Sequence, residues 1–399
     1  MTTEKLSTLP SSPAQTELEF IDSPGCQSTS LHDSDVPEVD LFSPLKIRDI
    51  TLPDRIAMSP MCQYSAEDGF ANDWHFVHLG SRATGGTHLI IVEATAVTAQ
   101  GRITPGDLGL WDDMHIEPLA RIVRFLREQG AIAGIQLAHA GRKASCNLPW
   151  LGGTPLTPEQ GGWPVIGPSP IPFQEGGPVP IPLDEGGIEE VIEAFVATAQ
   201  RAVQAGFQII EIHAAHGYLL HSFLSPLSNQ RTDRYGGSLE NRMRLLLEVT
   251  RRIREILPSG MPLFVRLSAT DWVEGGWDLK QSVILSRELK ELGVDLIDVS
   301  TGGLVPHARI PVQTGYQVPF AAKIREEAGI RTGAVGMIKE AEYANQVITR
   351  GCADLVLIGR EMLRDPYWSI HARSHLDEEP NWALPYGYAV KQRRQGKEI

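Results

Sequence analysis

The sequence predicts an α/β protein built as a (β/α)8 TIM barrel, and three observations carry this prediction. Short apolar runs typical of strands alternate eight times with longer amphipathic runs typical of helices. The alternation extends over roughly residues 55–372, which suits eight strand–helix units better than an open doubly wound sheet. Polar clusters follow several apolar runs directly, and barrels build their sites at the carboxyl ends of strands.

The ordered part of the chain is expected to begin near Leu41. Residues 1–40 are rich in Ser, Thr, Pro and Asp without a hydrophobic period, and we interpret them as a disordered N-terminal extension. Residues 45–52, closed by Pro53-Asp54, predict a short N-terminal hairpin. The expected barrel strands are Ile56–Pro60, Leu89–Thr95, Ile132–Leu137, Gln208–Ile212, Leu263–Ser268, Leu296–Ser300, Gly333–Gly336 and Leu355–Ile358.

An amphipathic run follows each expected strand. The helix over residues 238–257 shows the pattern most clearly, because Ser238 can cap it and its apolar residues make one stripe. The barrel is expected to span residues 41–373, before a polar C-terminal tail over residues 374–399. The expected helices cover residues 75–84, 116–129, 188–205, 238–257, 281–292, 319–328, 339–350 and 361–372.

The connection over residues 141–187, after the third strand, interrupts the regular alternation of strands and helices. Between Pro149 and Pro182 it contains ten prolines and seven glycines, and no regular period. Long loops inside a compact domain are typically lids or binding elements, so we expect a lid over the carboxyl ends of the strands. A passive insertion is the alternative.

Composition narrows the classes of function. The chain carries 36 Lys and Arg against 49 Asp and Glu, a net charge of -13, which argues against a nucleic-acid partner. Its four cysteines form no Cys-x-x-Cys pair, which argues against a zinc site. There is no apolar run long enough for a membrane span and no secretory signal, so we expect no membrane partner and a cytoplasmic location.

Two polar residues interrupt strands that should be buried. The apolar residues of Leu263–Ser268 share the face toward the outer helices, so Arg266 should point into the barrel. A buried guanidinium needs a strongly polar partner, either an anionic ligand or an internal carboxylate such as Glu211. Gln136 should also point inward beside small residues, as a ligand-binding amide or as a core amide bonded to backbone.

Glycines at the ends of the last two strands predict an anion site. Gly336 and Gly359 each end an apolar run, a helix follows each, and Arg360 comes next to the second glycine. Backbone N–H groups at such strand ends commonly bind phosphate in this fold.

The end of the first strand, Met58–Ser65, puts Cys62 and Tyr64 at the same face of the barrel. Cys62 could be a nucleophile, although an isolated cysteine usually is not.

The stretch Glu211–His221 ends the fourth strand and carries His213, His216 and Tyr218. The two histidines could be metal ligands, a buried pair, or donors to a substrate oxygen; the sequence offers no third ligand nearby. Tyr218, with an ordinary pKa of about 10, suits the protonation of a carbanion-like carbon.

These motifs together resemble the old yellow enzyme family of FMN-dependent ene-reductases, and within it the thermophilic-like subgroup. The resemblance runs from about Leu41 to Trp368, and cysteine in place of threonine at position 62 marks the subgroup. The matching stretches are Ser59–Tyr64, Trp74–His78, Ile91–Thr95, Gly134–Lys143, His213–Leu219, Asn229–Ser238 and Ile358–Arg360.

The resemblance implies that FMN lies over the barrel mouth. Gly336, Gly359 and Arg360 would bind its phosphate, Arg266 would stabilise the anionic reduced flavin, and Gln136 would pair with polar edges of the ring. Cys62 would tune the reduction potential and would not attack a substrate. The residues that would line the ring are Ser59, Pro60, Met61, Cys62 and Ala94.

The resemblance also implies the reaction. His213 and His216 would bind the oxygen of an activated alkene, such as an α,β-unsaturated ketone or aldehyde, a maleimide or a nitroalkene. Hydride would pass from NADPH (or NADH) through FMN to the β-carbon, Tyr218 would protonate the α-carbon, and Tyr64 would close the pocket. A homodimer or a homotetramer is implied for the assembly. The competing interpretations are a larger dienoyl-CoA or amine oxidoreductase, a metal-dependent hydrolase and a non-catalytic barrel.

Overall fold

The computed structural model describes residues 39–394, and eight parallel strands in it close into a barrel. Strands adjacent in the chain pair in the barrel, and the last pairs with the first, which confirms the predicted (β/α)8 fold. The strands are β3 (Ile56–Met58), β4 (Leu89–Ala96), β5 (Ile132–Ala138), β8 (Ile209–Ala214), β9 (Leu263–Ser268), β10 (Leu296–Ser300), β11 (Arg331–Ala334) and β12 (Leu355–Ile358).

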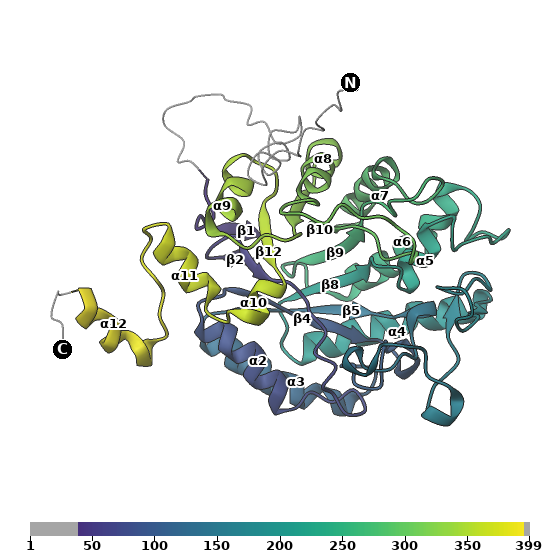
Figure 1. Ribbon diagram of the computed structural model, residues 1–399, viewed down its shortest axis with the longest axis horizontal. Coiled ribbons are helices and arrows are strands. Elements are labelled where there is room, and N and C mark those ends of the chain that lie inside the picture. Colours follow the sequence, from purple (N-terminus) through teal and green to yellow (C-terminus); the bar gives the residue numbers. More distant parts are fainter. Residues whose placement is uncertain (1–38, 395–399) are drawn as a thin grey trace, which may run out of the picture.

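Helices cover the outside of this barrel and lie above and below its strands in Figure 1. They are α2 (Asp73–Thr84), α3 (Ile116–Glu128), α4 (Glu185–Gln204), α5 (Leu219–Leu224), α6 (Leu239–Ile256), α7 (Leu279–Glu291), α8 (Val318–Ala328), α9 (Ala341–Thr349), α10 (Arg360–Arg364) and α11 (Trp368–His375). In α6, Ser238 accepts a hydrogen bond from Asn241 N–H as the predicted cap, and the predicted stripe faces the core.

Several predicted boundaries were wrong by about two residues or more, among them the end of the first strand, which stops at Met58 and not at Pro60. Three of the differences have clear local reasons. The helix predicted over residues 361–372 is divided into α10 and α11, because Pro366 has no N–H and disfavours helix at Asp365. Helix α4 starts at Glu185 because the Asp184 carboxylate caps its first turn. Strand β11 ends at Ala334, and the chain leaves the ladder before Gly336, which has a φ of 134°.

The predicted N-terminal hairpin closes one end of the barrel. Strands β1 (Leu45–Ile47) and β2 (Ile50–Leu52) pair in antiparallel fashion. Their buried side chains pack on inward residues near the amino ends of the barrel strands, among them Leu89, Phe264 and Leu355. Because this end is filled with apolar side chains, a polar site has room only at the opposite, carboxyl end.

Residues 141–184, between β5 and α4, contain three short 3-10 helices (Gly141–Lys143, Pro149–Leu151 and Pro158–Gln160) and a small parallel sheet of β6 (Ile166–Gly167) with β7 (Ile181–Pro182). In the C-terminal segment, α12 (Gly387–Arg394) lies apart from the barrel in Figure 1. The predicted disorder of residues 1–40 falls almost wholly outside the described residues. No helix in the described part of the chain is long and apolar enough to cross a membrane.

Candidate active site

The carboxyl end of β8 brings His213, His216 and Tyr218 together. The centroids of the two imidazole rings lie 5.1 Å apart, and those of His213 and Tyr218 lie 5.0 Å apart, both pairs edge to face. His216 Nδ1 lies 3.4 Å from His213 Nε2. One turn of backbone therefore presents two imidazoles and one phenol on a single side of the barrel mouth.

Both imidazoles are neutral at ordinary pH. Burial, with the nearby charge of Arg266 adding to it, holds the pKa of His213 and of His216 well below the usual value. Ala215 N–H donates to His213 Nδ1 over 3.3 Å, which assigns the His213 proton to Nε2. Ser300 Oγ contacts His216 Nε2 at 2.7 Å and leaves His216 Nδ1 facing the site.

The turn that carries these rings is unusual in its backbone. His216 has a φ of 59° and Gly217 a φ of 76°, so two consecutive residues are left-handed, which is costly for the histidine. His216 N–H donates to Ser268 Oγ (2.9 Å), and Lys143 Nζ donates to the carbonyl oxygens of His216 (2.8 Å) and Gly303 (2.9 Å). These contacts stabilise the strained turn.

Tyr218 is held in its protonated form. Burial raises the pKa of its phenol well above the usual value, and the nearby Cys62 and Tyr64 raise it further. The phenol can therefore act as a proton donor over the whole physiological pH range.

Strand registers place a layer of polar residues beneath the mouth. Arg266 on β9 lies beside His213 on β8 and Asp298 on β10. Arg266 Nε lies 3.0 Å from Asp298 Oδ2, so the internal carboxylate that the guanidinium contacts is Asp298 and not Glu211. Glu211 instead accepts a hydrogen bond of 2.8 Å from Gln136 Nε2. The amide oxygen of Gln136 remains as the acceptor that a ligand could use.

A cavity of about 180 Å³ opens at the ends of β11 and β12. Gly336, Gly359 and Arg360 line it, as the glycine pattern predicted, and Arg266 reaches it from inside the barrel. Lys339 and Arg364 add two further cationic side chains to its wall. Four cationic side chains against the single carboxylate of Glu361, with two chain turns at glycine, make the cavity suitable for an anionic group, and the anion site remains a prediction.

Cys62 and Tyr64 lie together after β3. One interpretation of the sequence was that Cys62 is a nucleophile. Burial, together with the carboxylates of Asp107 and Glu93, raises the pKa of the Cys62 thiol well above the usual range. A thiol that stays protonated is a poor nucleophile, which argues against that interpretation. Ser59, which follows β3, donates its N–H to the carbonyl of Ile358 and so joins the end of β3 to the end of β12.

A second cavity, of about 250 Å³, lies next to Tyr218. Tyr64 and Tyr218 line it from the barrel, and Phe173 lines it from the 141–187 segment. The Trp150 ring packs edge to face on Tyr64 at 6.3 Å, and Lys143 Nζ lies 4.4 Å from the Phe173 ring. The segment thus borders the space next to the phenols.

Sequence reasoning missed several residues of this region. Asp298 and Ser300 stand at alternating, inward positions of an apolar strand, the same signal that identified Arg266, and could have been found in that way. Lys143 gave no such signal, because it lies in a short turn after β5 and reaches the site only through the fold. Within the described residues, no cluster of three or more His, Cys, Asp or Glu side chains is placed to hold a metal ion.

The neutral state of His213 predicts a pH-dependent stability. In the folded protein its pKa lies well below the usual value, while the unfolded chain binds a proton below about pH 6.5. Lowering the pH from 7 to 5 should therefore favour unfolding, by about 2 kcal/mol for this residue. Urea unfolding in excess FMN should show a smaller loss between these pH values for His213→Asn than for the wild type. Equal losses would contradict a buried, neutral imidazole.

Comparison with known proteins agrees with this geometry. Residues 40–379 match the family described as NADH:flavin oxidoreductase / NADH oxidase. An NADPH dehydrogenase of a Geobacillus species is 50% identical over 351 residues, which make up 88% of this chain and 98% of that protein. An NADPH dehydrogenase of Bacillus subtilis is 49% identical over 341 residues, 85% of this chain and 96% of that protein. The structure of morphinone reductase is similar with a TM-score of 0.70 at 27% identity, over 86% of this chain and 91% of that one.

Fold, site and similarity together define a flavin-dependent oxidoreductase. The chain belongs to the NADH:flavin oxidoreductase / NADH oxidase family, of the old yellow enzyme type. Membership of this family implies FMN as the cofactor, and the two relatives named above are NADPH dehydrogenases.

The residues present fit FMN. The cation-lined cavity at Gly336 and Gly359 suits a phosphate group. Arg266 reaches from that cavity into the polar layer, where the free amide oxygen of Gln136 offers an acceptor to a planar polar ring. The chain thus offers a cation-lined end for the phosphate and polar side chains for the ring.

Proposed function

We propose that this protein is an ene-reductase, which uses NADPH to reduce the C=C bond of activated alkenes. The substrates would be α,β-unsaturated ketones and aldehydes, maleimides and nitroalkenes. The observation that supports this most directly is the single turn that presents neutral His213 and His216 with the protonated phenol of Tyr218. The Nε2–H of His213 suits a carbonyl or nitro oxygen, and a weak acid beside the histidine pair suits a carbanion-like carbon.

The proposed roles follow from the protons that each side chain carries. His213 Nε2–H donates to the substrate oxygen, and His216, oriented by Ser300, contributes its Nδ1 side. Tyr218 then gives its phenolic proton to the α-carbon. When bound, FMN would supply the hydride-transfer chemistry that connects NADPH with the β-carbon of the alkene. The 141–187 segment covers the second cavity and limits the access of water to it.

We also propose the cofactor contacts. Arg266 would hold the ring and balance negative charge on it, and the amide of Gln136 would bind a polar edge of the ring. Gly336, Gly359 and Arg360 would bind the phosphate in the cation-lined cavity. The residues proposed to line the ring are Ser59, Pro60, Met61, Cys62 and Ala94, and Tyr64 closes the substrate side.

Stopped-flow absorbance tests this function directly. Addition of NADPH without oxygen should bleach the flavin band, and addition of 2-cyclohexenone or N-methylmaleimide should restore it. Cyclohexanone, which keeps the oxygen and lacks the alkene, should leave the band bleached. If no activated alkene in such a panel restored the band, the proposed function would be wrong.

A further inference from the structure

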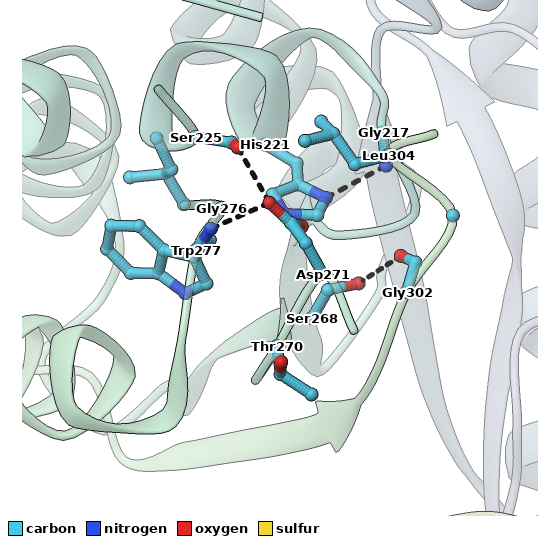
Figure 2. A network of polar contacts seen from close by, with 12 residues as sticks. Gly217, His221, Ser225, Ser268, Thr270, Asp271, Gly276, Trp277, Gly302 and Leu304 are labelled. Atoms are coloured by element: carbon cyan, nitrogen blue, oxygen red, sulfur yellow. Dashed lines mark hydrogen bonds and ion pairs between the residues drawn. The ribbon is translucent and has the colours of Figure 1, made fainter. Parts of the chain in front are cut away.

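A buried histidine–aspartate pair lies directly behind the proposed active-site turn, and none of the roles above uses it. His221 is on α5, and Asp271 follows the end of β9. His221 Nε2 lies 3.0 Å from Asp271 Oδ1, and both side chains are 0% exposed. Figure 2 shows the pair with its polar neighbours. Burying a carboxylate costs free energy, so the contacts that stabilise the pair indicate what the pair does.

The histidine of this pair contacts the active-site turn. Gly217 N–H donates to His221 Nδ1 over 2.9 Å (Figure 2). Because Nδ1 accepts a hydrogen bond, it carries no proton, and the ring proton lies on Nε2 toward Asp271. Asp271 thereby selects the tautomer in which His221 can hold the Gly217 amide, in the way that a carboxylate orients a functional imidazole.

The aspartate is itself held from two sides. Asp271 Oδ2 accepts hydrogen bonds from Ser225 Oγ (2.6 Å) and Trp277 N–H (2.7 Å). Burial alone would raise the pKa of Asp271, but His221 and these donors outweigh it, and the pKa is lowered. A Cβ at Gly276 would lie 2.8 Å from Asp271 Oδ2, so any residue with a side chain at position 276 would crowd the carboxylate.

The Gly217 amide lies between two proposed active-site residues. The peptide planes around Gly217 set the directions in which the His216 and Tyr218 side chains leave the backbone. This is a left-handed turn in close contact with the β10 loop, because a Cβ at Gly217 would lie 2.3 Å from the carbonyl oxygen of Gly303. Ser268 and Lys143 hold His216 from one side, and His221 is the contact that holds Gly217 from the other.

We propose that His221 and Asp271 are positioning residues for alkene reduction, which fix the peptide between His216 and Tyr218. The proposal rests on the proposed ene-reductase function. Neither side chain lines the cation-lined cavity at Gly336 and Gly359 or the second cavity, beside Tyr64 and Tyr218. Their loss should therefore change the rate at saturating alkene more than it changes the FMN content.

The test compares three holoenzyme variants with the wild type. In His221→Leu, the reoxidation of reduced enzyme by saturating 2-cyclohexenone should be about 10- to 100-fold slower, as expected for a small misplacement of reacting groups. Its FMN content should equal that of the wild type. His221→Asn should regain most of the rate, because its carboxamide oxygen can accept the Gly217 N–H. Asp271→Asn should slow the same step by a smaller factor.

His88 provides the matched control. It forms a second buried histidine–aspartate contact, 2.7 Å from His88 Nδ1 to Asp54 Oδ2, just before β4 at the opposite end of the barrel. His88→Leu should lower the unfolding temperature while the alkene step keeps its rate. If His221→Leu does not fold, the positioning role is tested by comparing the rate of reoxidation by 2-cyclohexenone in Asp271→Asn with that in His88→Leu. A slower rate in Asp271→Asn supports the role, and equal rates overturn it.

The outcomes separate the two proposals. Wild-type alkene rates in folded His221→Leu or Asp271→Asn would overturn the positioning role, and so would an equal rate loss in His88→Leu. A wild-type enzyme that NADPH reduces but no activated alkene reoxidises would overturn the proposed function instead.

Discussion

The Tyr218→Phe variant is expected to reduce alkenes about 100- to 10,000-fold more slowly, the range typical for the loss of a positioned acid. The phenylalanine ring can still pack on His213, whose ring centroid lies 5.0 Å from that of Tyr218, so the turn should keep its shape. Only the phenolic proton is removed, and the raised pKa of Tyr218 indicates that this proton is present at neutral pH. Stopped-flow traces with saturating 2-cyclohexenone measure the loss.

The reduction of the flavin by NADPH is the internal control for Tyr218→Phe. That half-reaction needs no proton from the phenol, so its rate should stay within a small factor of the wild type. Tyr64→Phe removes the other phenol of the same cavity and should affect the KM for the alkene more than the rate at saturation. Equal slowing of both half-reactions in Tyr218→Phe would remove its role as proton donor.

The Arg266→Leu variant is expected to lose bound FMN and about 3 to 5 kcal/mol of unfolding free energy, as when one partner of a buried ion pair is removed. Asp298, 0% exposed and 3.0 Å from Arg266, would keep a buried carboxylate without its cation. Burial already raises the pKa of Asp298, and Arg266 is the group that opposes this increase. The carboxyl of Asp298 should therefore become protonated at a higher pH in the variant.

A double variant distinguishes whether Arg266 binds an anionic ligand or serves only as the partner of an internal carboxylate. In Arg266→Leu/Asp298→Leu the unpaired carboxylate is gone, and apolar replacement of a buried pair is often neutral for stability. Unfolding by urea should show most of the stability regained, while flavin absorbance after gel filtration should show that FMN is still lost. Full FMN retention in the double variant would mean that Arg266 serves only as the partner of Asp298.

The direction of Arg266 was predictable from the sequence, but its neighbours were not. Alternation within Leu263–Ser268 showed which face is apolar, because successive side chains on a strand point to opposite sides. The carboxylate beside Arg266 depends on the register between β9 and β10, which pairs it with Asp298. Registers are set by contacts between distant segments, so the sequence suggested Glu211, the other inward-facing carboxylate, instead.

For the histidine pair, too, the sequence predicted the position, whereas the tertiary structure decided the protonation and the contacts. Its place at a strand end, with Tyr218 beside it, came from the local pattern of residues, and the resemblance then favoured an oxygen-binding role over a metal site. The proton position of His213 comes from the local contact with Ala215 N–H, and the orientation of His216 comes from Ser300 Oγ on another strand. The low pKa of both histidines results from burial, which is a property of the packed barrel.

The sequence by itself determined the barrel, the hairpin at its amino end, the long segment after the third strand and the family motifs, because these depend on periodicity and residue identity over short distances. Three contacts were decided only by the tertiary structure. Asp298 forms an ion pair with Arg266, and Lys143 donates a hydrogen bond to the His216 carbonyl. His221, oriented by Asp271, accepts a hydrogen bond from the Gly217 amide. Each of these contacts joins residues from different strands or loops. Their distances are fixed by register and by the packing of the barrel, which no local pattern records.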